Sequence, residues 1–173
     1  QEALSPQADI ASEPRWARIN GTFGDSPELV KRMVRGYISG IQDGTHGLTP
    51  QSVAAIVKHW VGYGAAKDGW DSHSAYGKYA LFTGDNLATH IYPFTGAFEA
   101  HVAGVMPTYS ILQNAHWHGK AIAPLAAGFN HFLLTDLLKK QYRFDGIILS
   151  DWLITNDCNA VCENGVKPGE TPV

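Results

Sequence analysis

The sequence predicts an α/β fold in which parallel strands are joined by helical crossovers. Two observations lead to this class. Short apolar segments of strand length alternate with longer segments of helical spacing, and several of the apolar segments end abruptly in polar residues. Because parallel neighbours need a long crossover between them, this order favours a parallel sheet covered by helices.

Four apolar segments are predicted as strands: residues 4–11, 52–60, 104–110 and 144–152. The last segment has a glycine followed by a short apolar run that stops at a carboxylate, Asp151, which is typical of a buried parallel strand ending in a site. Side chains alternate between the two faces of a strand, so this carboxylate continues a line of core residues. We also consider a simpler interpretation, in which it is a helix N-cap or a strand-end hydrogen bonder.

Three segments are predicted as helices. Residues 27–41 show the clearest helical spacing, with Ser26 as the N-cap. A short helix is predicted at residues 93–102, and another at 130–143, capped by Asn130.

The segments 61–92 and 111–128 have no period and are predicted as long loops, which in compact domains usually shape a binding site.

Composition narrows the class of protein. The 173 residues carry a formal net charge of -3 with a pI near 6.2, so there is no basic surface for nucleic acid or an anionic membrane. No apolar segment approaches the roughly 18 residues of a membrane span. Residues 1–3 lack the features of a secretion signal. Cys158 and Cys162 could form a small disulfide or remain thiols, and we favour the disulfide.

No cofactor or metal is expected. The segment 62–67 superficially resembles a dinucleotide-binding turn, but Lys67 occupies the third glycine position and no helical pattern follows. His116 and His118 have ligand-like spacing, yet no third ligand lies nearby in the sequence. Ser150 is not part of the Gly-x-Ser-x-Gly turn of a serine hydrolase.

Polar residues collect at or just beyond the predicted strand ends. An eight-stranded α/β barrel gathers residues from several strands at one mouth in this way. Lys58 could instead simply mark an exposed strand end. The collected residues are Arg18, Lys58, His59, Tyr109, Asp151 and Trp152.

Four segments in the same order resemble glycoside hydrolase family 3: SPQADIASEPRWARINGTFGDSP, VKHW, GVMPTYS and FDGIILSDW. The resemblance implies part of a (β/α)8 TIM-type barrel, about half of it present. Residues 1–173 would be a partial barrel domain that lacks upstream strands and a downstream α/β-sandwich domain.

The resemblance also implies roles for individual residues. Asp151 would be the nucleophile of a retaining glycoside hydrolase, which needs a second carboxyl group roughly 5 Å away as its acid/base. The residues expected to contact the sugar are Arg18, Lys58, His59, Met106, Tyr109 and Trp152.

The expected reaction is release of β-linked glucose from the non-reducing end of a β-glucoside or oligosaccharide. The remainder of a parent chain would supply the acid/base, and we expect the 173 residues alone to be inactive. We expect a periplasmic or secreted protein that binds no nucleic acid and spans no membrane.

Two alternatives stay open. Asp71 and His73 could form the acid/base dyad of the family's β-N-acetylglucosaminidase branch. The chain could instead be a sugar-binding remnant without catalytic activity.

Overall fold

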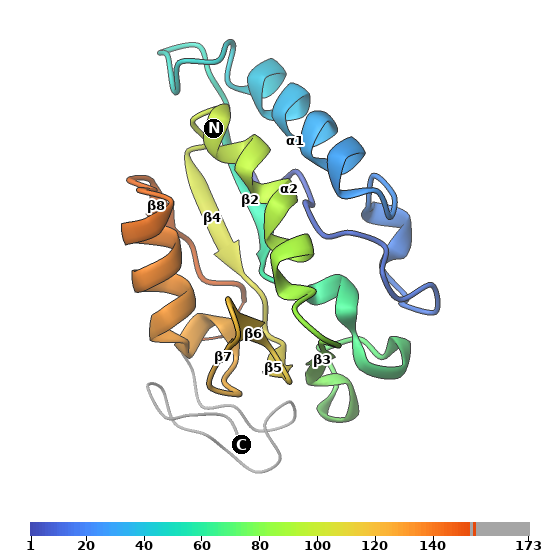
Figure 1. The fold of residues 1–173 in the computed structure, drawn as a ribbon. Coiled ribbons are helices and arrows are strands. Elements are labelled where there is room, and N and C mark those ends of the chain that lie inside the picture. Colours follow the sequence, from blue (N-terminus) through green and yellow to red (C-terminus); the bar gives the residue numbers. More distant parts are fainter. Residues whose placement is uncertain (153, 155–173) are drawn as a thin grey trace.

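A four-stranded parallel sheet forms the centre of the computed structural model, which describes residues 1–152 and 154 (Figure 1). Its order is β1-β2-β4-β8, and every neighbouring pair is parallel, which confirms the predicted class. Two further pairs flank it: β3 and β5 are parallel, and β6 and β7 form an antiparallel hairpin. The strands are β1 (Glu2–Ala3), β2 (Ala54–Trp60), β3 (Tyr79–Leu81), β4 (Gly104–Pro107), β5 (Ile111–Gln113), β6 (His116–Trp117), β7 (Lys120–Ala121) and β8 (Ile147–Ile148).

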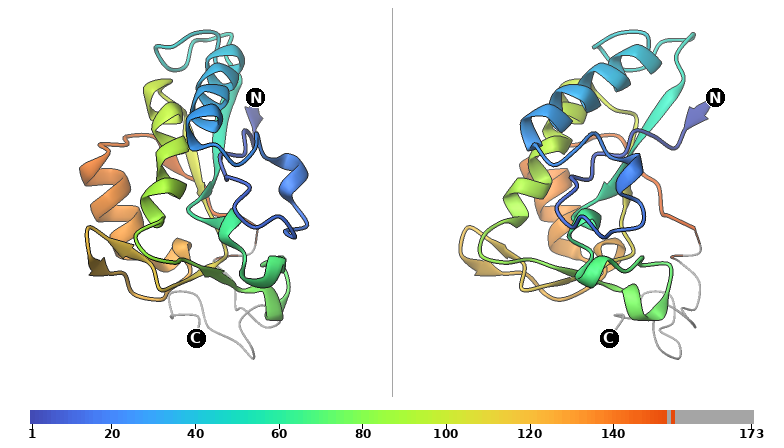
Figure 2. Two further views of the ribbon diagram at one scale, coloured as in Figure 1. Left: turned by 45° about the vertical axis from the view of Figure 1, so that its right-hand side comes forward. Right: turned by 90° about the vertical axis from the view of Figure 1, so that its right-hand side faces the viewer.

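Helices α1 (Pro27–Ile41) and α2 (Leu87–Glu99) pack against each other over one face of the sheet (Figures 1 and 2). The remaining helical segments are η1 (Ile19–Gly21), η2 (Tyr63–Ala65), η3 (Lys67–Gly69), η4 (Ala75–Gly77) and η5 (Ala127–Phe129), which are 3-10 turns, and η6 (Phe132–Gln141), which is a π-helix.

The predicted N-cap of α1 is confirmed. The Ser26 hydroxyl accepts a hydrogen bond from the Leu29 amide at 3.4 Å, which satisfies one free donor of the first turn. Val30, Val34 and Ile38 follow at four-residue intervals and are fully buried. One stripe of this helix therefore supplies the core, as its spacing predicts.

Helix α2 begins six residues before the predicted start at Pro93. Proline is common in a first turn, which favoured the later start, but here it lies inside the helix. Leu87 and Ile91 are buried in the core ahead of it. Their burial stabilises the earlier turns, so the prediction of a loop over 61–92 is wrong for this part and for β3.

The first predicted strand is also shorter than expected. Over residues 4–11 only Gln7 forms a bridge, to Lys58, and the regular ladder lies at Glu2–Ala3. The predicted loop 111–128 contains β5, β6 and β7. In the third predicted helix, the Asn130 side chain accepts a hydrogen bond from the Leu133 amide at 3.1 Å, as a cap would.

Strand β8 is not buried as predicted. Ile147 is 55% exposed and Ile148 is 36% exposed. The reason is positional: β8 is the outer strand of the sheet, and within residues 1–152 it pairs on one side only, with β4.

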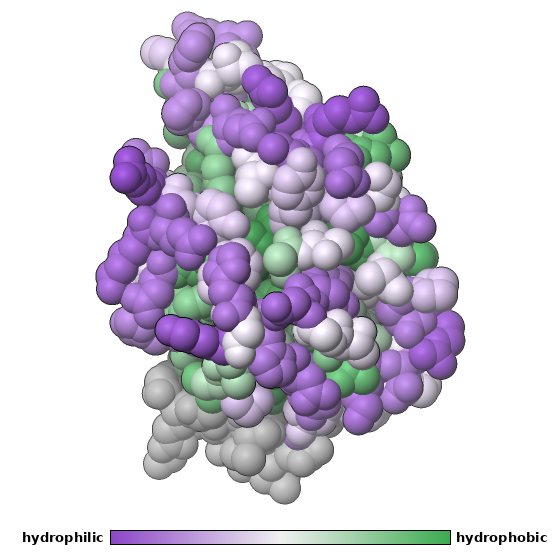
Figure 3. Space-filling model, in the orientation of Figure 1, coloured by the Kyte–Doolittle hydropathy of each residue, from purple (hydrophilic) through white to green (hydrophobic). Residues whose placement is uncertain are grey.

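The outer surface is mixed in character (Figure 3). Hydrophilic side chains dominate the periphery of the face that carries α1 and α2, and hydrophobic side chains show between the elements. Among the described residues, no helix combines the length and apolar character needed to cross a membrane. Cys158 and Cys162 lie outside the described residues, so their predicted pairing stays a prediction.

Candidate active site

Asp151 follows β8 on the face of the sheet opposite the helices. The side chains of Ile56 and Ile147 meet over Gly104, so all three lie on that face. Strand β8 ends at Ile148, three residues before Asp151, and Ile147 is exposed, so the predicted line of core residues leading to this carboxylate is wrong. The Asp151 side chain is 7% exposed, and its Oδ1 atom accepts a hydrogen bond from the Trp152 amide at 2.8 Å.

His59 connects this carboxylate to a second, buried one. Its Nε2 atom lies 4.0 Å from Oδ2 of Asp151. On the other side of the ring, Nδ1 donates to Oδ2 of Asp9 at 2.8 Å, and the His59 amide donates to the same oxygen at 3.2 Å. With its hydrogen on Nδ1, the ring presents Nε2 towards Asp151.

Two cationic side chains lie beside these carboxylates. Lys58 is paired in register with Met106 across β2 and β4, on the site side of the sheet. Burial lowers the pKa of Lys58, the positive charge of Arg18 lowers it further, and the negative charges of Asp151 and Asp9 act in the opposite direction. The Lys58 ammonium therefore interacts electrostatically with Arg18, Asp151 and Asp9.

The β4 segment supplies Met106 and Tyr109. Met106 is 3% exposed, whereas its neighbour Val105 belongs to the core under the helices. The Tyr109 hydroxyl donates to the carbonyl oxygen of Trp152 at 2.5 Å. Burial raises the pKa of Tyr109, and the nearby Asp151 charge raises it further, so this phenol stays protonated at neutral pH.

A second polar cluster lies in the segment after β2. The His73 ring contacts Asp71 through Nδ1, at 2.5 Å from Oδ1, and the Tyr63 hydroxyl donates to the same oxygen at 2.9 Å. Burial raises the pKa of Asp71, but hydrogen bonds from the His73 amide, the His73 ring and Tyr63 outweigh it and lower the pKa overall. The cluster borders the first site, since His73 packs edge-on against Tyr109 with ring centroids 5.1 Å apart.

The predicted residues thus come together from four separate parts of the chain. Arg18 lies over the Tyr63 ring, 5.3 Å from its centroid, and the Tyr63 ring in turn packs on His59 at 4.9 Å. Trp152 differs from the rest because its side chain is 75% exposed, at the rim of the site. The Asp151 side chain accepts a hydrogen bond from the Trp152 amide, and its backbone carbonyl accepts one from the Ile154 amide.

Sequence reasoning missed Asp9 and Tyr63. Asp9 is 2% exposed and lies between the buried residues Ala8 and Ile10. A carboxylate inside a predicted strand, between apolar neighbours, is a signal that the sequence does carry. Tyr63 had no such signal, because it lies in a segment without period.

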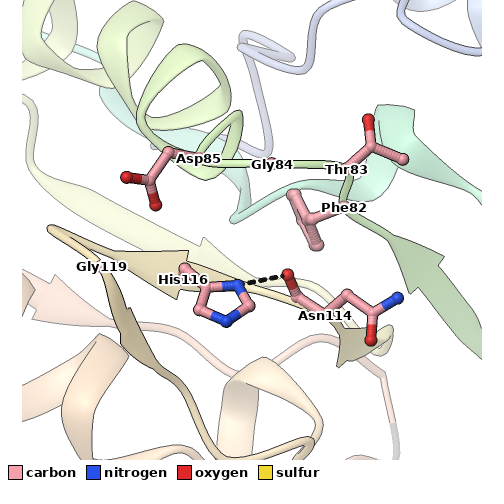
Figure 4. Close-up of a pocket in the computed structure, with 7 residues that line it drawn as sticks. All are labelled: Phe82, Thr83, Gly84, Asp85, Asn114, His116 and Gly119. Carbon is pink, nitrogen blue, oxygen red and sulfur yellow. Dashed lines mark hydrogen bonds between the residues drawn. The ribbon is translucent and has the colours of Figure 1, made fainter.

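A separate open pocket of about 570 Å³ lies between the segment after β3 and the β5–β7 region (Figure 4). None of the predicted site residues lines it. Its lining residues are Phe82, Thr83, Gly84, Asp85, Asn114, His116 and Gly119.

Comparison with known proteins decides the family. The model of the glycosyl hydrolase family 3 N terminal domain matches residues 1–165. The chain belongs to glycosyl hydrolase family 3. This agrees with the order and identity of the four segments from which the resemblance was drawn.

Relatives within family 3 are named as enzymes acting on β-glycosides. The chain is 72% identical over 172 residues to a periplasmic beta-glucosidase/beta-xylosidase of Dickeya chrysanthemi, covering 99% of this chain and 26% of that protein. It is 41% identical over 155 residues to a probable beta-glucosidase C of Aspergillus oryzae, covering 90% of this chain and 23% of that protein. The chain therefore spans about a quarter of the length of these relatives.

Solved structures of family members share the fold. A beta-glucosidase from Listeria innocua superposes with a TM-score of 0.74 at 25% identity, covering 88% of this chain and 20% of that one. An exo-1,3/1,4-beta-glucanase from a Pseudoalteromonas species also superposes with a TM-score of 0.74, at 27% identity, covering 88% of this chain and 23% of that one.

Proposed function

We propose that this chain carries the nucleophile and the innermost sugar site of a retaining glycoside hydrolase that releases β-linked glucose from the non-reducing end of β-glucosides or oligosaccharides. The observation that supports it is the convergence on Asp151. This buried carboxylate lies 4.0 Å from the His59 ring, with the Lys58 and Arg18 cations close by.

The chemistry assigns one task to each side chain. In the first step an Asp151 oxygen attacks the anomeric carbon, the bond to the leaving oxygen breaks, and an acid gives that oxygen its proton. In the second step water, activated by the same acid/base, displaces the carboxylate and releases the sugar. Oδ2 is the attacking atom we propose, because Oδ1 is already held by the Trp152 amide.

The polar neighbours of Asp151 would hold the sugar. Lys58, Arg18 and the Nε2 side of His59 offer hydrogen-bonding groups to sugar hydroxyls, and fixing the ring lowers the entropic cost of attack. Met106 and Tyr109 would border the reacting ring, and Trp152 would line the outer part of the cleft. No cofactor takes part in this scheme.

We further propose that the chain is part of a longer protein, which would supply the remaining strands of the barrel and the acid/base. The coverage of about a quarter of the relatives supports this. A periplasmic or secreted location is supported by the printed name of the Dickeya chrysanthemi relative.

The proposal is tested on the full-length protein with 4-nitrophenyl β-glucoside. Asp151→Asn should lower kcat by about 1,000-fold or more, which corresponds to about 4 kcal/mol of transition-state stabilisation. Asp145→Asn is the matched control, because Asp145 lies in the same segment and is exposed. Asp151→Asn activity within tenfold of wild type would rule out the proposed nucleophile.

One observation favours a second candidate, a β-N-acetylglucosaminidase. The Asp71–His73 pair is formed as an acid/base dyad requires, and it borders Tyr109. The full-length protein and its His73→Ala variant should be compared on aryl β-glucoside and aryl N-acetyl-β-glucosaminide. Preference for the second substrate, lost in the variant, would replace the glucosidase proposal.

A further inference from the structure

Tyr63 is a fully buried side chain at the junction of the two polar clusters of the candidate site. The Arg18 guanidinium lies over its ring, 5.3 Å from the centroid. The His59 ring meets the Tyr63 ring at 89°, with centroids 4.9 Å apart. We propose that Tyr63 is a positioning residue, whose ring holds Arg18 and His59 in the geometry in which they bind the innermost sugar.

The backbone around Tyr63 can place the ring there only because a glycine precedes it and another follows it. Gly62 has a φ of +96°, and a Cβ atom there would collide with the Phe82 ring. A Cβ atom at Gly64 would collide with the Ile10 carbonyl oxygen. The Gly-Tyr-Gly segment, which superficially resembles a dinucleotide-binding turn, is therefore the turn that inserts this ring into the site.

This turn is hydrogen-bonded to the segment that leads to Arg18. The Gly64 carbonyl accepts hydrogen bonds from the Ser12 hydroxyl at 2.6 Å and from the Glu13 amide at 3.1 Å. Trp16, which is 1% exposed, packs on the tyrosine ring of the turn with centroids 4.7 Å apart. Figure 2 shows this segment, in blue, beside the turn after β2, in green. Arg18 therefore reaches the ring from a segment that is bound to the same turn.

The hydroxyl end of Tyr63 is fixed as well. It donates to Oδ1 of Asp71 at 2.9 Å, and its oxygen lies 3.1 Å from Nδ1 of His73. Burial raises the pKa of Tyr63 to about 12, so the phenol keeps the proton that it donates at neutral pH. A ring that is held by its backbone, its neighbours and its hydroxyl has one orientation, as a side chain that orients binding groups requires.

The ring also interacts directly with the two groups that it would position. A guanidinium is attracted by the partial negative charge of an aromatic face. Without that attraction the long Arg18 side chain would have to be ordered when the sugar binds, which costs affinity. Asp9 fixes the His59 ring at Nδ1, and contact with the Tyr63 ring limits its tilt. Loss of the tyrosine ring should therefore weaken sugar binding.

This inference rests on the proposed function, and the experiment separates the two. In the full-length protein, Tyr63→Phe keeps the ring and Tyr63→Leu removes it. Glucose binding is measured by calorimetry, and hydrolysis is measured with 4-nitrophenyl β-glucoside. We expect Tyr63→Leu to weaken glucose binding and to lower kcat/KM about 3- to 10-fold, and Tyr63→Phe to stay within about threefold of wild type.

A tyrosine on the other face of the sheet provides the matched control. Tyr92 lies on α2 and also has a cation over its ring, with the Lys31 ammonium 5.0 Å from the centroid. Tyr92→Leu should change neither glucose binding nor hydrolysis. An equal loss in Tyr92→Leu and Tyr63→Leu would overturn the positioning role.

A double-mutant cycle tests whether the ring acts through Arg18. The loss of glucose binding caused by Tyr63→Leu should be at least twofold smaller in an Arg18→Met background than in the wild type, because part of it is already lost there. Equal losses in the two backgrounds are the result of a ring that only supports the fold, and they would overturn the proposal.

A second substitution covers the case in which Tyr63→Leu does not fold. Pentafluorophenylalanine placed at position 63 keeps the ring and its packing but removes the negative charge of the ring face. It should weaken glucose binding about threefold relative to Tyr63→Phe. Binding equal to that of Tyr63→Phe would count against the interaction with Arg18 and overturn the proposal.

The wild-type measurements distinguish failure of this inference from failure of the proposed function. A wild type that binds glucose but hydrolyses no β-glucoside would refute the proposed function, and the binding contrast would still decide the role of Tyr63. A wild type that binds no glucose would refute both. An active wild type whose Tyr63→Leu variant binds glucose equally well would refute the role of Tyr63 alone.

Discussion

The buried Asp9–His59 pair offers a sharp test of how the site is built. Asp9 accepts two hydrogen bonds from His59, one from the ring at 2.8 Å and one from the amide at 3.2 Å. We expect it to act as a positioning residue, because it keeps the hydrogen on Nδ1 and leaves Nε2 facing Asp151. Asp9→Asn keeps the shape but removes the charge and half of the accepting capacity.

The expected loss of activity in Asp9→Asn follows from the Asp9–His59 hydrogen bond that the substitution weakens. A hydrogen bond to a charged group contributes about 1.5–3 kcal/mol when buried, and its partner here is 2% exposed at the side chain. If that energy is lost from the transition state, the rate falls about 10- to 150-fold. The loss should appear mainly in kcat, since a tilted His59 ring misplaces the sugar at the moment of attack.

The assay is steady-state hydrolysis of 4-nitrophenyl β-glucoside by the full-length protein, with its pH profile. Asp68→Asn is the control, because its side chain is 61% exposed and belongs to a different segment. An Asp9→Asn variant that folds normally and stays within twofold of wild type would refute the positioning role.

Three further predictions concern stability. Burial lowers the pKa of His90 to about 4, so the unfolded state takes up a proton at a higher pH than the folded state does. The free energy of unfolding should therefore fall by up to roughly 3 kcal/mol as the pH drops from 6.5 to 4. His90→Phe should flatten this pH dependence, measured as the apparent Tm. Ser26→Ala should destabilise α1 by about 1 kcal/mol, seen as faster hydrogen exchange of its amides. Gly36→Ala should stabilise α1 by about 0.5–1 kcal/mol and so slow the exchange of the same amides, because no atom lies within 4 Å of the new Cβ. Unchanged exchange in either α1 variant, or a His90→Phe profile equal to wild type, would contradict the corresponding prediction.

The sequence predicted elements well where the period was strong. Helix α1 has both its spacing and its N-cap in the sequence, and its bounds are as expected. Helix α2 was placed too late because Pro93 looked like a first turn, whereas burial of Leu87 and Ile91 extends the helix before it. Tertiary contacts of this kind leave no local signal.

The site was predictable where a polar residue ends an apolar run. Lys58, His59 and Asp151 follow that rule, and the structure brings them close together. Asp9 also lies in a predicted strand, but its partner His59 is 50 residues away in the sequence, and their contact is formed only by the fold. Tyr63 lies in a segment without period, and its packing on His59 and under Arg18 depends on contacts that only the fold provides.

The central claim is that Asp151 attacks the anomeric carbon. The most direct measurement treats the full-length protein with a 2-fluoro β-glucoside that carries a good leaving group, then locates the adduct by peptide mass spectrometry. A slowly hydrolysed glycosyl-enzyme with the sugar on Asp151 is the expected result. An adduct on another carboxylate, or rapid turnover with no trapped sugar, would contradict the claim.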